Sequence, residues 1–357
     1  MRASPLAVTL CLVIASCASP SPSSSPATGS LPAKAPPSAS ASVPGDASPP
    51  PAAASAGTTP TPDPLASVRK PMSDLQATRL IAEVETSGAP DWQVAAFGSL
   101  WIGTGGDNTV VRVDLGTNRV GASIPVDGPC LGMAAGFGSV WSPSCGATTV
   151  DRIDPATNRV VARIAVPGIV GDGEGQLVAA FGSVWLFTDS IGTLTRLDPA
   201  TNRVSATYHL GGGASIVATA TALWSTVPDQ DAVLELAPDG TVIRTISVGR
   251  APRFIAAGEG AVWSLGQGDG DVTRIDPATG RVVATISVEV PGEGGCIAAG
   301  VGGVWVTMPD TPFSKIDPGS NTVVAQYTGA GGDCIGVGDG SVWLSNHDLH
   351  AVWRLRP

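Results

Sequence analysis

Tryptophan recurs along this sequence at a nearly constant spacing. Successive positions are 40, 44, 39, 39, 42 and 38 residues apart, at Trp101, Trp141, Trp185, Trp224, Trp263, Trp305 and Trp343. A period near 40 residues is typical of repeat proteins, in which each unit buries its apolar face against the next unit. Residues 76–357 are therefore expected to fold as one array of seven units.

Each unit has the pattern of four short β-strands. In the second unit a small-residue strand leads to a turn at Phe137 and Gly138, an apolar strand carries Trp141, and a third strand ends in Asp154-Pro155 before a β-branched fourth strand. Four short strands per period are typical of a propeller and not of a helical solenoid. The predicted fold is an all-β, seven-bladed β-propeller, whose innermost strands of small residues leave a channel along the axis.

The turn after the third strand follows known turn chemistry. Asp accepts local backbone hydrogen bonds, Pro sets φ, and the fifth residue needs a positive φ. Only Asn and Gly, which tolerate that conformation, occupy the fifth position, at Asn118, Asn158, Asn202, Gly280 and Asn321. A residue that recurs at one place in every blade is expected to maintain the blade structure. These turns, the tryptophans and one recurring arginine are therefore interpreted as structural. The arginine recurs at Arg112, Arg152, Arg196, Arg274 and Arg354.

The two ends of the repeat array predict how the ring closes. The last unit stops at Pro357, directly after its third strand, so the seventh blade lacks a fourth strand. The segment 79–84 precedes the first blade where the segment 119–124 precedes the second. We expect this N-terminal segment to supply the missing strand, because pairing the chain ends removes the exposed edges of an open array.

The first 75 residues differ in composition from the repeats. Residues 1–16 predict a signal peptide, because their apolar run of about ten residues is shorter than the roughly 20 that span a membrane. Residues 14–17, Ile-Ala-Ser-Cys, resemble the bacterial lipoprotein processing box, which predicts lipidation of Cys17. An ordinary secretory signal with an incidental cysteine is the alternative.

Residues 17–75 are rich in Ser, Ala and Pro and predict a disordered tether between the anchor and the propeller. A multiply acylated cysteine holds a protein on a membrane without a spanning helix. The expected location is therefore outside the cytoplasm, with the chain attached to the cell membrane or envelope through its lipid anchor only.

Four cysteines, Cys130, Cys145, Cys296 and Cys334, lie in the expected propeller. An even number in an oxidising compartment favours disulfides, and three pairings are possible. Extending the hairpin register of the second blade places Cys130 opposite Cys145, within disulfide range. Cys296 and Cys334 each lie nine residues before their blade's tryptophan, so a bridge across the boundary of blades six and seven is expected. Two buried or metal-binding thiols are the alternative.

The repeat motifs resemble two groups of propellers. Residues 138–141, Gly-Ser-Val-Trp, and 154–164, Asp-Pro-Ala-Thr-Asn-Arg-Val-Val-Ala-Arg-Ile, resemble the YVTN or YncE-like repeats of exported bacterial proteins. They also resemble the repeats of the virginiamycin B (streptogramin B) lyase-like group. That second resemblance implies a magnesium site with histidine and glutamate side chains near one mouth of the channel, including a Glu-x-His pair. This chain contains no Glu-x-His, and its histidines are His209, His347 and His350.

One face of the predicted propeller is acidic. Loops between second and third strands, and loops entering each first strand, should share the face on which propellers usually bind ligands. These loops carry Asp107, Asp127, Asp172, Glu174, Asp189, Asp229, Asp231, Asp269, Asp271, Glu293, Asp310, Asp333 and Asp348. With a formal net charge of −10 and no cluster of Lys and Arg, nucleic acid is not an expected partner. Cations, basic peptides or polar glycans suit the negative charge of this face better. The alternative is that these carboxylates only solvate the surface and bind no ligand.

The residues predicted to bind a ligand are polar, lie on that face and do not repeat. They are Asp172, Glu174, Arg250, Arg253, Glu293, His347 and Asp348. No nucleophile motif, phosphate loop or zinc-spaced histidine pair with a third ligand accompanies them, so no catalytic residue, metal or cofactor is predicted.

Three classes of function remain. The first, which the sequence favours, is a binding or scaffolding module of the cell envelope for a small polar or cationic ligand, a glycan or an envelope protein. The second is a virginiamycin B lyase-like or lactonase-like enzyme with a metal-assisted site at the channel mouth. The third is a structural component of the envelope.

Overall fold

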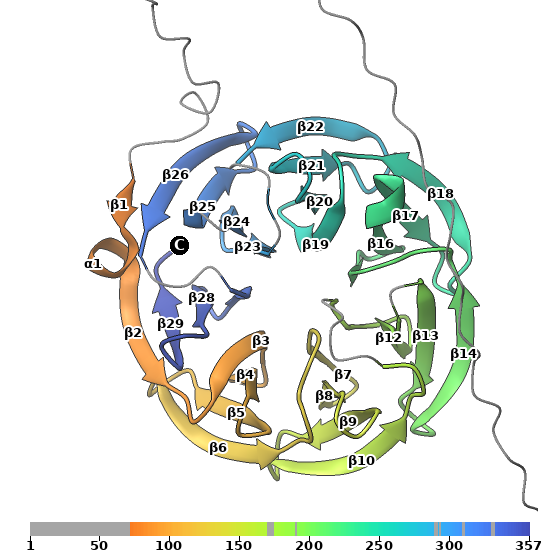
Figure 1. Cartoon of the computed structure of the whole chain (residues 1–357), viewed down its shortest axis with the longest axis vertical. Coiled ribbons are helices and arrows are strands. Elements are labelled where there is room, and N and C mark those ends of the chain that lie inside the picture. Colours follow the sequence, from red (N-terminus) through yellow and green to blue (C-terminus); the bar gives the residue numbers. More distant parts are fainter. Residues whose placement is uncertain are drawn as a thin grey trace, which may run out of the picture. The chain divides into compact units, whose positions relative to one another are not determined.

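A computed structural model describes residues 72–169, 175–189, 191–288, 292, 294–308, 311–329 and 333–357. The predicted signal peptide, the tether up to residue 71 and Cys17 lie outside the described residues. Over the described part the predicted seven-bladed β-propeller is confirmed, with seven β-sheets arranged around one axis (Figure 1).

Six blades contain four strands that follow one another in the chain from the axis outward. Blade 1 contains β3 (Ala89–Ala96), β4 (Ser99–Gly105), β5 (Thr109–Asp114) and β6 (Arg119–Pro125). Blade 2 contains β7 (Ala134–Gly136), β8 (Ser139–Ser144), β9 (Thr149–Asp154) and β10 (Arg159–Ala165). Blade 3 contains β11 (Val178–Ala180), β12 (Ser183–Phe187), β13 (Thr193–Asp198) and β14 (Arg203–His209).

Blades 4 to 6 repeat this order. Blade 4 contains β15 (Ile216–Ala218), β16 (Leu223–Val227), the 3₁₀ helix η2 (Pro228–Gln230), β17 (Ala232–Leu236) and β18 (Val242–Ser247). Blade 5 contains β19 (Pro252–Gly258), β20 (Ala261–Gly266), β21 (Asp271–Ile275) and β22 (Val282–Ser287). Blade 6 contains β23 (Cys296–Gly300), β24 (Gly303–Met308), β25 (Thr311–Asp317) and β26 (Thr322–Thr328).

Blade 7 is completed by the N-terminal segment, as predicted. It contains β27 (Ile335–Gly338), β28 (Ser341–Asn346), β29 (Ala351–Leu355) and β2 (Leu80–Glu85). Strand β2 pairs antiparallel with β29, with Val84 opposite Val352, and lies beside it in orange in Figure 1. The ring is therefore closed by backbone hydrogen bonds between the two ends of the array.

The residues just before β2 extend this closure to blade 6. Strand β1 (Ser73–Asp74) pairs parallel with β26, and helix α1 (Leu75–Arg79) follows it. The Asp74 carboxylate caps the helix by accepting a hydrogen bond from the backbone N–H of Ala77 (2.7 Å). Arg79 donates to the Tyr327 hydroxyl (2.7 Å) and to the backbone oxygen of Pro357 (3.1 Å). One arginine thus joins blade 6 to the end of blade 7.

The two sides of the disk carry different connections. We call the side with the turns after the first and third strands the turn face, and the opposite side the entry face. On the turn face the predicted left-handed positions are confirmed, with φ of 53°, 56°, 54° and 55° at Asn118, Asn158, Asn202 and Asn321. The aspartates that begin these turns accept the expected local hydrogen bonds, as Asp154 does from the backbone N–H of Ala156 (2.9 Å).

The recurring arginine joins four of the blades to the next one, whereas Arg196 of blade 3 donates to Ser183 of its own blade (2.7 Å). In blade 2 the Arg152 guanidinium lies over the buried Trp141 ring, 4.9 Å from its centre, and Nε donates to Ser139 Oγ (2.8 Å). Its Nη1 donates to the Pro199 carbonyl (2.7 Å) and to Asn202 Oδ1 (2.9 Å) in the turn of blade 3. Equivalent contacts to the next turn are made by Arg112, Arg274 and Arg354.

Blade 4 reaches the same result with different residues. Glu235 occupies the arginine position, and Arg244 lies opposite it on β18. The two side chains form an ion pair (2.6 Å), and Arg244 Nη1 donates to the Thr279 carbonyl in the turn of blade 5. In blade 6 Lys315 replaces arginine, with Nζ 4.7 Å from the centre of the Trp305 ring.

Replacing Arg152 by Met should weaken the joint between blades 2 and 3. Met keeps apolar contact with the Trp141 ring but loses the charged hydrogen bonds, so the free energy of unfolding should fall by about 2 kcal/mol. Urea unfolding followed by tryptophan fluorescence measures the change. Arg159→Met, an exposed position on the same face, is the control and should change it by less than about 0.5 kcal/mol. Equal effects of the two substitutions would contradict this role.

Candidate functional site at the entry-face end of the axis

One ring of positions at the start of the inner strands does not repeat. It consists of the residues nine positions before each blade's tryptophan, namely Trp92, Gly132, Gln176, Ser215, Phe254, Cys296 and Cys334. The seven tryptophans themselves are invariant and fully buried. Blade packing therefore demands one residue type at the tryptophan position and none in this ring, which is where the blades differ chemically.

Two aromatic residues of this ring meet although their blades are not neighbours. Trp92 lies in β3 of blade 1 and Phe254 in β19 of blade 5, and their ring centroids are 6.0 Å apart. Both strands shift register near these residues, and the side chains are buried, with 8% and 2% of their surface exposed. The expected lining of small residues does not hold at this level of the axis. Sequence reasoning missed this pair, whose only signal is an aromatic residue at a position otherwise held by smaller side chains.

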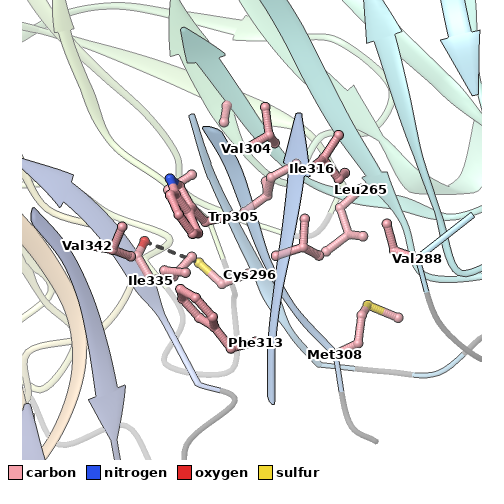
Figure 2. Close-up of a cluster of buried hydrophobic side chains, with 14 of the residues drawn as sticks. Leu265, Val288, Cys296, Val304, Trp305, Met308, Phe313, Ile316, Ile335 and Val342 are labelled. Atoms are coloured by element: carbon pink, nitrogen blue, oxygen red, sulfur yellow. Dashed lines mark hydrogen bonds between the residues drawn. The ribbon is translucent and has the colours of Figure 1, made fainter. Parts of the chain in front are cut away.

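Cys296 and Cys334 lie in the same buried cluster as the aromatic pair. Their sulfur atoms are 3.0 Å apart across the boundary of blades 6 and 7, and both are free thiols. Figure 2 shows Cys296 beside Ile335 of blade 7, and its Sγ contacts the backbone oxygen of Ile335 at 3.8 Å. Burial raises the pKa of the Cys334 thiol well above its usual value. The expected contact between the two cysteines is present, and the bridge between them stays a prediction.

The other cysteine pair is confirmed as a disulfide. Cys130 and Cys145 are bonded in blade 2, with their Cα atoms 5.9 Å apart. The hairpin register does not continue to them, because the β7–β8 ladder ends at Ala134 and an isolated bridge joins Pro129 to Ser144. The pairing was therefore predictable, whereas the directly facing geometry was wrong.

Charged residues precede the aromatic and cysteine positions in three blades. Asp91, Arg253 and Asp333 each lie ten residues before their blade's tryptophan. In each case a hydroxyl of the preceding blade donates to the backbone carbonyl of the charged residue. The donors are Ser345 to Asp91 (2.6 Å), Thr226 to Arg253 (3.0 Å) and Thr307 to Asp333 (2.9 Å). The backbone at this end of the axis is thus held from one blade to the next.

The predicted site residues fall into two described groups. Arg250, in the loop before β19, forms an ion pair with Asp269 (2.7 Å) in blade 5, and Arg253 follows within β19. His347 and Asp348 are exposed in the loop between β28 and β29 of blade 7. The backbone N–H of His347 donates to Asp333 Oδ2 (2.8 Å). Blade 6 separates the two groups, and Asp172, Glu174 and Glu293 lie outside the described residues.

Several carboxylates of the acidic face hold their own loops. Asp189 accepts a hydrogen bond from the backbone N–H of Thr193 (2.8 Å), and Asp231 accepts one from Ala251 (2.9 Å). Asp269 accepts from the backbone N–H of Arg250 (2.7 Å), and this bond and the guanidinium of Arg250 lower the pKa of Asp269. Part of the negative charge of the entry face therefore comes from carboxylates that stabilise the loops.

Asp271 is different, because its carboxyl group is buried and its Oδ1 has no hydrogen-bond partner among the described residues. Gly249 and Gly266 pack so closely against it that a Cβ on either would collide with the carboxyl group. Burial, and secondly the negative charge of Asp269, raise the pKa of Asp271 to about 6. Sequence reasoning placed it among the surface carboxylates and could not detect this burial.

Replacing Asp271 by Thr, the residue at the same place in β5, β9 and β13, should remove a pH dependence of stability. The native carboxyl group holds its proton up to about pH 6, whereas the unfolded chain releases it near about pH 3.9. Wild-type stability should therefore fall as pH rises from about 4 to about 6, by up to about 3 kcal/mol, and stay lower above that. Urea unfolding across this window measures the slope. Asp348→Thr is the control and should keep it, and a flat wild-type profile would contradict the burial argument.

No resident metal site is evident in the part of the chain that the structure describes. Those residues contain no group of three His, Cys, Asp or Glu side chains that could hold a metal ion. His209 lies in the outer strand β14, with Nδ1 3.2 Å from Thr193 Oγ1, and His350 is exposed in the same loop as His347. No helix among the described residues is long and apolar enough to cross a membrane.

Solved structures of the same architecture include two lyases. Streptogramin B lyase has a TM-score of 0.67 at 18% identity, over 80% of this chain and 99% of that chain. Virginiamycin B lyase from Staphylococcus aureus has a TM-score of 0.66 at 16% identity, over 77% of this chain and 98% of that chain. In fold, the chain resembles streptogramin B lyase.

The similarity extends to a WD40 propeller. The WD40 propeller domain of Doa1 has a TM-score of 0.62 at 14% identity, over 78% of this chain and 96% of that chain. Identities this low show the fold alone. The sequence matches no family model and no curated protein. The resemblance to the lyase group is thus confirmed for architecture.

Proposed function

We propose that this protein is an exported, membrane-anchored β-propeller that binds a ligand or a partner protein at its entry face, as a binding or scaffolding module of the cell envelope. The observation that supports this most is the ring of non-repeating residues at the entry-face end of the axis. Residues that maintain the blades recur from blade to blade. A ring that combines Trp92, Phe254, Gln176 and Ser215 at equivalent positions serves no common packing need.

The polar half of this ring favours a ligand with hydrogen-bonding groups. Ser215 Oγ and Gln176 Oε1 are buried atoms with no hydrogen-bond partner among the described residues. Buried polar atoms are normally bonded, so a polar ligand at this end of the axis would have two atoms to bond. Trp92 and Phe254 occupy equivalent positions in blades 1 and 5, and small-molecule sites combine apolar and polar side chains of these kinds.

The charge of the entry face narrows the ligand class. Its carboxylates favour a cationic or neutral polar ligand, such as a small cation or a glycan, over an anionic one. Nucleic acid is again disfavoured, because binding it depends on neutralising phosphates.

Export is supported by the signal-peptide pattern and by the Cys130–Cys145 disulfide, because disulfides persist in oxidising compartments outside the cytoplasm. Cys17→Ala should leave the chain released or unprocessed while the propeller still folds. Mass spectrometry of membrane-extracted wild-type protein should find a lipidated Cys17 at the N-terminus. An unmodified N-terminus at any other residue would contradict the anchor.

A thermal-shift screen of the full chain with metal ions, amines and sugars tests binding at the entry face. A ligand at about 100 times its Kd stabilises the native state by about 2.7 kcal/mol, which raises Tm by about 5 °C for a domain of this size. The shift should be lost in Ser215→Ala, which removes a buried hydroxyl without a partner among the described residues, and kept in Ser205→Ala, a matched change at an exposed position of the outer strand β14. A ligand whose shift survives every entry-face substitution binds elsewhere and would contradict the site.

The second candidate function is a lyase acting on streptogramin B antibiotics, favoured by the similarity over 99% of the streptogramin B lyase chain. One solved structure is of a catalytically inactive histidine-to-alanine variant of virginiamycin B lyase with quinupristin. The histidines at the entry-face end of the described blades are His347 and His350 in the loop of blade 7 and His209 at the end of β14. Turnover of quinupristin that is lost in His347→Ala or His350→Ala would establish the enzyme, whereas binding without turnover favours the module.

A further inference from the structure

Three neighbouring blades expose phenylalanine at the same place on the turn face. Phe97, Phe137 and Phe181 each begin the two-residue turn between the first and second strands of blades 1, 2 and 3, which follow one another around the ring in Figure 1. Phe97 and Phe137 are 45% and 40% exposed. Phe181 is partly buried against the core of blades 3 and 4. The aromatic rings therefore form an arc on one side of the turn face.

The backbone at these positions does not favour an aromatic residue. Their φ values are 53°, 54° and 51°, in the left-handed region that favours Gly, Asn or Asp. Blades 5 and 7 form the same turn with Glu259 and Asp339. Since the turn forms with polar residues, the exposed rings at Phe97 and Phe137 are not required by the fold.

Basic side chains lie on the same face as the aromatic arc. Arg119, Arg159 and Arg203 begin the fourth strands of blades 1, 2 and 3 directly after the turns, and all three are exposed. The aspartates of these turns direct their carboxylates at the turns' own backbone N–H groups, as Asp198 does to Ala200 (2.8 Å). Hydrogen bonds within the turns lower the pKa of Asp114, Asp154 and Asp198, so these carboxylates stay ionised. The turn face of blades 1 to 3 sets six arginines against them, namely Arg112, Arg119, Arg152, Arg159, Arg196 and Arg203. This part of the face is therefore net positive although the whole chain carries a net charge of −10.

We propose that the turn face of blades 1 to 3 rests on an anionic lipid surface. Phe97 and Phe137 enter the interfacial layer, and Arg119, Arg159 and Arg203 contact lipid phosphates. Aromatic rings flanked by cations match this layer, since the rings bury apolar surface and arginine pairs with phosphate. The features sit on separate hairpin tips along an arc and form a broad surface, which suits a lipid layer better than a peptide.

This contact would orient the protein. With the turn face on the membrane, the acidic entry face points away from anionic lipid, where a ligand can reach it. The inference rests on the proposed envelope location, because that location brings a membrane within reach, and it adds a second contact to the anchor expected at Cys17.

Vesicle sedimentation of the full chain carrying Cys17→Ser tests the surface without any lipid anchor. We expect binding to phosphatidylglycerol-containing vesicles, weaker binding to phosphatidylcholine alone, and a further decrease as salt rises from about 0.05 M to about 0.5 M. The double variant Phe97→Asn, Phe137→Asn should lower the partition coefficient by at least about tenfold. Because Asn suits a left-handed turn before Gly, this variant should unfold in urea at the same or a higher concentration.

The control is Val283→Asn with Val324→Asn, two exposed apolar residues of blades 5 and 6 that lie outside the arc. It should bind vesicles like the parent chain. Equal binding by the phenylalanine variant, or no binding to anionic vesicles, would overturn the proposal. Retention on envelope proteins without vesicle binding would also overturn it, by assigning the face to a protein partner. An unlipidated Cys17 in cells would count against the anchor alone, since the vesicle assay does not use it.

Discussion

A guanidinium held between a tryptophan ring and the turn of the next blade is the contact on which this propeller depends. It places a cation over the face of a buried indole and directs its N–H groups at oxygens of the neighbouring turn, as Arg152 does at Asn202. The turn asparagine serves twice, because its backbone takes the left-handed conformation and its side chain accepts the hydrogen bond. Blade 4 shows that the contact matters more than the residue, since Arg244, positioned by Glu235, binds the next turn from another strand.

Because this joint lies on the turn-face side of the blades that have it, the opposite end of the inner strands is less constrained. Hydroxyl groups of preceding blades hold the backbone there, and the side chains vary from blade to blade. Aromatic rings, thiols and polar groups can then gather at one end of the axis without disturbing the ring. The candidate site and the most strongly perturbed carboxyl group, Asp271, both lie on this entry face.

The two faces therefore differ in charge and in how far their side chains repeat from blade to blade. The entry face is acidic and chemically varied, which suits selective recognition of a ligand. The turn face repeats the same arginine and aromatic positions over three blades, which suits contact with an extended surface that has no particular shape. A chain anchored at one end and supported on one face would present the varied face outward.

Much of this architecture could be predicted because its chemistry is local and recurs in every blade. The tryptophan period, the left-handed asparagines, the closing strand and the Cys130–Cys145 pair each depend on residues close in sequence or at equivalent places in the repeat. The candidate site depends instead on contacts between side chains that cannot be predicted from the spacing of residues in the sequence. Trp92 reaches Phe254 from a blade that is not its neighbour, and Asp271 loses its solvent because two glycines of adjoining segments close over it. The sequence by itself determined the blades and their order, since each blade contains the residues that form its own turns and strands. Only the tertiary structure decided which side chains share the end of the axis, because closing the ring brings together residues that no local interaction connects.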